Sequence, residues 1–232
     1  MKAAKQYLSD VPLIALVAAN VVPVAGVLFL GWDAFYVVLF YWAENVAVGF
    51  YTILKIACVK VPHPAAHLGK LFAIPFFMVH YGGFTGIHGL FVLGMFKKGS
   101  EGLGGGADWP CFLVFVQLLL NVIREAYSIM PANMKLAMAA LFASHGVSFV
   151  YNYLIRGEYA VSKVDKLMGE PYGRVVVMHI AILAGGFFTM SLGSPVALLL
   201  ALVALKTVVD VKLHRREHQR KQKCLKTAVA HP

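Results

Sequence analysis

The first candidates for chemistry are five ionisable residues inside apolar segments, where lipid is the expected neighbour. They are Glu44, His80, His88, His145 and His179. Two of the histidines belong to the stretch HYGGFTGIHG (80–89), within a run from 71 to 96 that has no formally charged residue. An ionisable side chain in the bilayer core is costly unless it is paired or faces water, so each of the five is a functional candidate.

Four of these residues have the types and depths expected of a metal centre. If every apolar segment crosses the membrane, Glu44, His88, His145 and His179 lie roughly 16, 13, 16 and 8 Å from one face, at 1.5 Å per residue. Three imidazoles and a carboxylate suit zinc or iron. We therefore predict that the three histidines are ligands, and that Glu44 is either a fourth ligand or a general base.

The metal would determine the chemistry of such a centre. Zinc with an open coordination position lowers the pKa of bound water to about 7, which favours attack on an ester, amide or phosphate. Iron with nitrogen and oxygen ligands would instead favour oxygen chemistry. In both cases the expected substrate is a membrane lipid or a lipid-soluble molecule. Of the two reactions, we expect hydrolysis.

The last apolar segment carries a second group of ionisable residues. Lys206, Asp210 and His214 recur every four positions, which places them along one stripe of a helix. The stripe predicts catalytic roles for Asp210 and His214, with an entrance, a proton path or partners for metal-bound histidines as the alternatives. In the alternative without a function, the Lys206 side chain extends to the membrane–water interface, and Asp210 and His214 lie at that interface.

Further polar residues flank the predicted centre. Asn45, Asn152, Tyr172 and Arg174, together with Lys206, are candidates for orienting ligands or substrate. Each of them is equally compatible with a role in helix packing or at the membrane interface.

Haem b is the alternative cofactor. His80 and His88 are eight residues apart, about 12 Å along a helix, so one metal ion cannot bind both. If the cofactor is haem, His80 is the expected ligand. Glycines at positions 82, 83, 86 and 89 would let a flat macrocycle approach the backbone. The same glycines are typical of close helix packing, and Glu44 has no evident role beside a bis-histidine haem.

A proton-coupled transporter is a third class of function, although the sequence shows no inverted repeat.

The elements that position these residues are expected to be transmembrane helices. The chain has 232 residues, of which 59% are hydrophobic and 14% charged, as in an integral membrane protein. Apolar runs predict helices at 11–32, 34–58, 70–96, 110–129, 133–155, 174–192 and 195–213. The fold class is all-α: a polytopic transmembrane bundle over residues 1–213, followed by a basic tail over 214–232.

Two arguments disagree on the number of crossings. The positions of Lys and Arg in the loops favour six, with the segment 110–129 not crossing. The shared depth of Glu44 and the histidines favours seven, because with six crossings His179 would move toward the opposite face. We expect seven helices, with six as the alternative.

The charge distribution indicates which partners to expect. Formal net charge is +10, and much of it lies in the stretch from Val211 to Lys226. A basic segment after a final helix is typical of a cytoplasmic tail that contacts anionic lipid headgroups, so we expect a cytoplasmic C-terminus and no nucleic-acid partner. The cysteines at 58, 111 and 224 form no paired motif.

Several motifs carry a family resemblance. The segments YWAEN, IPFFMVHYGGFTGIHG, SHGVSFVYNY, PYGRVVVMH and KTVVDVKLH together resemble a family of bacterial multi-pass inner-membrane proteins known as a domain of unknown function. The resemblance covers roughly residues 40 to 214. It implies a location in the bacterial inner membrane and assigns no site residue.

A looser, architectural similarity is to the seven-helix zinc amidases of the alkaline ceramidase and adiponectin-receptor group. Those proteins also gather histidines near one membrane face, which implies that such a constellation can hydrolyse lipids. They end in a paired-histidine HxxxH, whereas this chain has Asp210 and His214 at the comparable place. Its second helix carries a glutamate in place of their serine-histidine motif.

Overall fold

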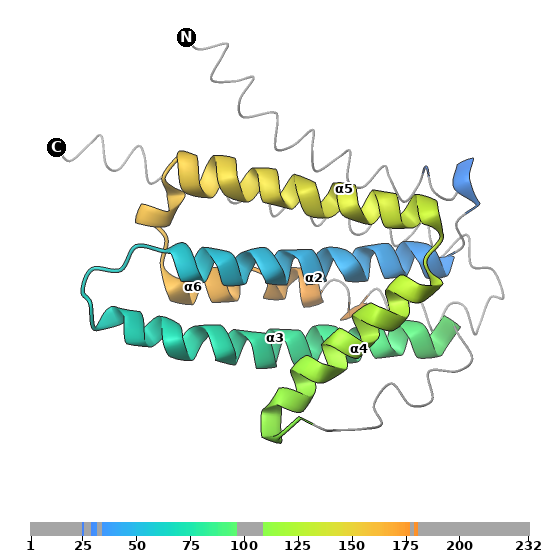
Figure 1. The fold of residues 1–232 in the computed structure, drawn as a ribbon, viewed down its shortest axis with the longest axis horizontal. Coiled ribbons are helices and arrows are strands. Elements are labelled where there is room, and N and C mark those ends of the chain that lie inside the picture. The colour runs from blue at the N-terminus through green and yellow to red at the C-terminus, as the bar shows by residue number, and fades with distance from the viewer. Residues whose placement is uncertain (1–24, 26–28, 32–33, 97–108, 177–178, 181–232) are drawn as a thin grey trace, which may run out of the picture.

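The computed structural model describes residues 25, 29–31, 34–96, 109–176 and 179–180 (Figure 1). This part of the chain is helical and contains no strand. Its elements are α2 (Ala34–Cys58), α3 (Ala66–Phe96), η1 (Cys111–Leu113), α4 (Val114–Ile129), α5 (Ala132–Ser148), the π-helix η2 (Phe149–Ile155), η3 (Glu158–Ala160) and α6 (Val164–Gly169).

Four of the described helices are long and apolar enough to cross a membrane. They are Phe35–Cys58, Ala66–Gly94, Cys111–Ile129 and Ala132–Ile155. They coincide with the predicted segments 34–58, 70–96, 110–129 and 133–155, which confirms an all-α protein with several apolar helices of membrane-spanning length.

The full count of seven helices is not confirmed. The predicted helix 195–213 and the tail 214–232 lie outside the described residues, as does most of 11–32. The predicted helix 174–192 is described only at 174–176 and 179–180.

Helix α2 is central and contacts both α3 and α5 (Figure 1). Side chains tie α2 to α3 at two levels. The indole Nε1 of Trp42 donates to the carbonyl oxygen of Thr85 at 2.7 Å, and the hydroxyl of Tyr81 donates to the carbonyl oxygen of Asn45 at 3.0 Å. Residue numbers rise along α2 as they fall along α3, so the two helices are antiparallel.

Helix α5 and its continuation η2 run parallel to α2. The Tyr51 hydroxyl donates to the carbonyl oxygen of Phe142 at 3.0 Å, and the Tyr153 hydroxyl donates to that of Lys55 at 2.8 Å. Beyond these helices, Gly157 adopts a left-handed φ of 78°. In the turn that follows, the carbonyl oxygen of Tyr159 accepts a hydrogen bond from the backbone N–H of Lys60, in the loop after α2. The ends of α2 and η2 therefore lie at the same end of the bundle.

Two apolar clusters of buried residues hold the helices together. One joins the first half of α2 to Val92 of α3, Val122 of α4 and Met134 of α5. The other joins Ile56, near the end of α2, to Phe77 of α3 and to residues of η2 and α6. Both clusters include α2, which explains why this helix is the most buried of the candidate spans.

Glycines of α3 allow neighbouring helices to approach it closely. A Cβ atom added at Gly86 would lie 3.1 Å from the backbone nitrogen of Leu119 in α4. One added at Gly89 would lie 2.6 Å from the Trp42 ring and 2.5 Å from the Val122 side chain. The described structure thus uses these glycines for helix packing, which was the alternative to a haem contact.

Replacing Gly89 by alanine should therefore destabilise the bundle. A Cβ atom at this position overlaps the Trp42 indole, and overpacking of this kind typically costs about 1–3 kcal/mol. Gly82→Ala is the matched control, because its Cβ would lie 3.4 Å from Leu119 Cδ2, an ordinary contact. We expect thermal unfolding in detergent to show a lower Tm for Gly89→Ala alone, and equal values would contradict the packing argument.

Candidate functional site

An ion pair links α2 to the chain that follows α6. Arg174, in the helical residues 172–176, donates from Nη1 to Oε1 of Glu44 at 2.8 Å. Glu44 is buried, and the Arg174 side chain is 32% exposed. A carboxylate at this depth needs a cation to offset its desolvation, and Arg174 supplies one. The pair brings together two residues that the sequence analysis had assigned to different roles.

Two of the three predicted metal ligands meet. Nε2 of His88 lies 2.8 Å from Nδ1 of His179, and the two rings are nearly perpendicular. His88 Nδ1 lies 2.7 Å from the carbonyl oxygen of Phe84, one turn earlier in α3. A carbonyl oxygen only accepts hydrogen bonds, so Nδ1 of His88 carries a proton, and its Nε2 is the nitrogen that shares a hydrogen bond with Nδ1 of His179.

The third predicted ligand, His145, lies elsewhere. Its ring stacks on that of Tyr51, with a centroid separation of 6.2 Å and an interplanar angle of 22°. It belongs to α5, whereas His88 belongs to α3, and Figure 1 shows these helices on opposite sides of α2. The structure therefore brings His88 and His179 together and places His145 in an aromatic group with Phe142.

His80 contacts the chain after α6 but has different partners from His88. Its Nδ1 lies 2.6 Å from the hydroxyl oxygen of Tyr172, and the ring of Phe76 stacks against it with centroids 5.3 Å apart. Burial raises the pKa of the Tyr172 hydroxyl, so this group remains protonated at neutral pH and can donate to His80. Tyr172 thus contacts His80, and its predicted role of orienting ligands or substrate stays a prediction.

Tyr81 is a buried polar residue that the sequence analysis missed. Its hydroxyl bonds to the backbone of Asn45, the residue after Glu44, and its ring lies 5.8 Å from that of Tyr172. The sequence carried a signal for it, because Tyr81, Thr85 and His88 are spaced i, i+4, i+7 along one helix. In the structure all three are buried. They form one stripe of α3, called the polar stripe below.

The two predicted asparagines bond within their own helices. Asn45 donates from Nδ2 to the carbonyl oxygen of Tyr41 at 3.1 Å. Asn152 donates to the hydroxyl of Ser148 at 3.2 Å and accepts from Nη1 of Arg156 at 3.4 Å. Neither contact reaches the histidine pair.

The described residues contain no group of three His, Cys, Asp or Glu side chains arranged to hold one metal ion. The histidine pair is therefore the candidate centre. It joins α3 to the residues after α6, and the Glu44–Arg174 ion pair joins α2 to the same part of the chain. Lys206, Asp210 and His214 lie outside the described residues.

Removing one partner of the ion pair should cost more than removing both. Arg174→Gln leaves the buried Glu44 without this cation, a change that typically costs about 3–5 kcal/mol. We expect the double variant Glu44→Gln, Arg174→Gln to recover most of the loss in thermal stability. Arg124→Gln, at an exposed position of α4, is the control. Strictly additive effects of the two single substitutions would contradict the pairing.

Comparison with known proteins gives the family and no activity. No curated protein and no solved structure matches the chain. A family model covers residues 2–227, nearly the entire chain. The chain therefore belongs to DUF6498, a family of unknown function.

Proposed function

We propose that this integral membrane protein binds one zinc or iron ion between His88 and His179 and hydrolyses a lipid-like substrate there. The observation that carries the proposal is the convergence of His88 Nε2 and His179 Nδ1 to 2.8 Å, with His88 Nδ1 anchored on a backbone carbonyl. Metal-bound histidines commonly have such an anchor, because it fixes the tautomer and the ring orientation.

The separation of the two nitrogens is close to what a metal ion requires. Zinc–nitrogen bonds are about 2.0–2.1 Å long, so two nitrogens of a tetrahedral site lie roughly 3.3 Å apart. The imidazoles would have to separate by about 0.5 Å, which small side-chain rotations can provide. Two histidines would leave positions for water, substrate and a further ligand, and Asp210 and His214 remain predicted contributors.

Glu44 supports the hydrolytic part of the proposal as a general base. Its charge is maintained by Arg174 at 2.8 Å, and a base must be unprotonated to accept a proton from water. A bound zinc or iron ion would supply a water of lowered pKa. Arg174 would then act as a positioning residue that holds the carboxylate of Glu44 in one orientation.

Metal analysis of purified protein tests the centre directly. We expect about one equivalent of zinc or iron in the wild type and a loss of most of it in His88→Ala and in His179→Ala. His145→Ala is the matched control and should retain the metal, because His145 packs on Tyr51. Size-exclusion chromatography shows whether each variant is folded.

Three results would count against the proposal. A wild-type protein without metal would contradict it, and so would an equal loss of metal in all three variants. A Soret band in the visible spectrum would indicate bound haem b in place of the zinc or iron ion, and His80 was the predicted haem ligand.

Proton-coupled transport is a second candidate, favoured by the Glu44–Arg174 ion pair. The pair joins α2 to the chain after α6, so protonation of Glu44 would weaken a link between two segments. Substrate-dependent proton flux in liposomes, abolished in Glu44→Gln and present in protein free of metal, would support this function over hydrolysis.

The helix directions support the alternative of six crossings. Because α3 is antiparallel and α5 parallel to α2, the chain between α3 and α5 must return to the face from which it left. In Figure 1, α4 crosses α3 obliquely, and its end lies beside the start of α5. This arrangement puts Lys60 and Tyr159, joined by a backbone hydrogen bond of 2.9 Å, on one side of the membrane, which we infer to be cytoplasmic.

Cysteine labelling in intact cells tests this topology. Single cysteines at Lys60 and at the exposed Val161 should both resist a membrane-impermeant maleimide until the cells are permeabilised. The background needs the native cysteines replaced. Labelling of one position and not the other in intact cells would mean that α4 completes a crossing and that seven helices span the membrane.

A further inference from the structure

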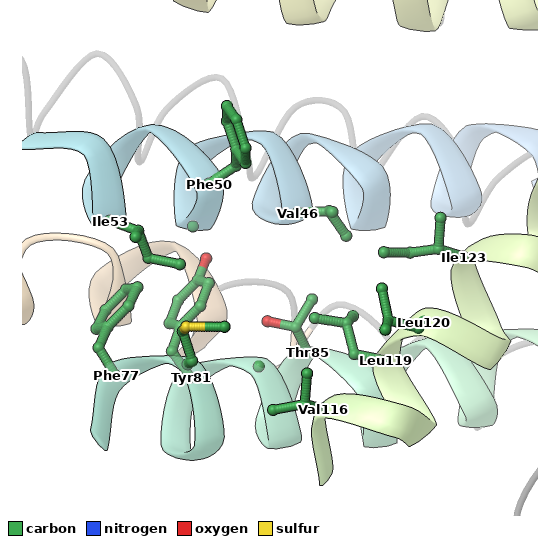
Figure 2. Close-up of a pocket in the computed structure, with 13 residues that line it drawn as sticks. Val46, Phe50, Ile53, Phe77, Tyr81, Thr85, Val116, Leu119, Leu120 and Ile123 are labelled. Carbon is green, nitrogen blue, oxygen red and sulfur yellow. The ribbon is translucent and has the colours of Figure 1, made fainter. Parts of the chain in front are cut away.

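A cavity of about 220 Å³ lies between α2, α3 and α4 (Figure 2). Val46 and Ile53 of α2 line it from one side, and Leu119 and Ile123 of α4 line another wall. Helix α3 contributes residues that include Tyr81 and Thr85. Tyr81 and Thr85 therefore connect the cavity to the polar stripe, whose third member is His88.

The lining of the cavity offers too few polar groups to hold water. Apart from Tyr81 and Thr85, its side chains are apolar, and a buried water needs two to four polar partners. Helices α2 and α3 are candidate membrane spans, and the cavity lies against their middle parts, so hydrocarbon is the expected surrounding medium at this depth. The volume is below the roughly 300 Å³ at which pockets for drug-sized ligands begin, so it suits a single slender chain.

Thr85 gives the cavity one polar contact point. The residue is 2% exposed, and its Oγ1 makes no well-aligned hydrogen bond to a described residue, although it interacts with the neighbouring Tyr81 hydroxyl. The neighbouring Tyr81 hydroxyl donates its proton to the carbonyl oxygen of Asn45. A buried hydroxyl without a well-aligned hydrogen bond is costly, and a ligand oxygen beside Thr85 would remove that cost.

The depth of Thr85 restricts the ligand further. It lies 11 residues before the end of α3 at Phe96, about 16 Å along the axis and near the middle of a ~30 Å hydrocarbon core. A charged headgroup cannot reach this depth without a large desolvation cost. The oxygen must therefore belong to an uncharged group, such as an ester or amide carbonyl.

We propose that the cavity binds one hydrocarbon chain of an uncharged lipid, with an ester or amide carbonyl oxygen accepting a hydrogen bond from Thr85. Thr85 precedes His88 by three residues, about 4.5 Å along the axis and on the same side of α3. The carbonyl is thus held one turn from the histidine pair. This inference deepens the proposed function by naming its substrate class, and it rests on that function only for the reaction.

A photoreactive long-chain fatty acid methyl ester, with a diazirine in the chain, tests the binding step. In detergent we expect saturable labelling at one equivalent, on peptides that contain Val46–Ile53 or Val116–Ile123. Val116→Phe fills the cavity and should lower labelling at least tenfold. Val147→Phe, at an exposed position of α5, should label as the wild type does.

The Thr85 contact is tested by a second variant and a second probe. Thr85→Val keeps the shape of the side chain and should weaken ester labelling about five- to tenfold, while labelling by a diazirine-bearing alkane stays unchanged. Labelling that does not saturate, or that is equal in Val116→Phe and wild type, would overturn the cavity proposal. Equal ester labelling in Thr85→Val and wild type would overturn the carbonyl contact.

A third comparison separates this inference from the metal centre. Ester labelling should persist in His88→Ala, because the chain binds through the cavity and Thr85. Saturable labelling of a wild-type protein that contains no metal would support the lipid site and contradict the proposed metal chemistry. Metal in a protein that shows no saturable labelling would support the metal centre and contradict the lipid site. A loss of labelling in folded His88→Ala would overturn the claim that the lipid site and the metal centre are independent.

Discussion

The ion pair between Glu44 and Arg174 determines where the polar groups of this bundle meet. A carboxylate in the interior of a membrane helix needs a cation, and the chain after α6 supplies one from the helical residues 172–176. Once Arg174 is held at Glu44, the residues on either side of it are placed against α3. Tyr172 then reaches His80, and His179 reaches His88. One electrostatic contact thus aligns two further polar contacts along α3.

Helix α3 serves two purposes with different faces. Its glycines let α4 and Trp42 pack closely, and its polar stripe of Tyr81, Thr85 and His88 extends from an apolar cavity to the histidine pair. Close packing and an open cavity coexist because Gly86 and Gly89 make the tight contacts, while Gly82, one turn earlier, borders the cavity. The resulting arrangement places a hydrocarbon-lined space beside ionisable groups, which is what chemistry on a membrane-dissolved molecule requires.

The sequence predicted the class of fold and part of the site, and its errors have physical causes. Apolar length alone located four helices, because few other structures satisfy backbone polar groups in lipid. The pairing of His88 with His179 was also expected. The depth argument failed for His145, since depth in a helix does not specify which neighbour the helix packs against. Arg174 was expected only as an orienting, packing or interfacial residue, and its pairing with Glu44 was not foreseen. Tyr81 was missed because a tyrosine in an apolar helix is usually read as part of the core.

The central claim is that His88 and His179 share one metal ion, and X-ray absorption spectroscopy of the metal-loaded protein tests it most directly. The account predicts two imidazole nitrogens at about 2.0–2.1 Å from zinc, and the loss of one of them in His179→Ala. A spectrum without imidazole scattering, or one unchanged by substitution of either histidine, would contradict it.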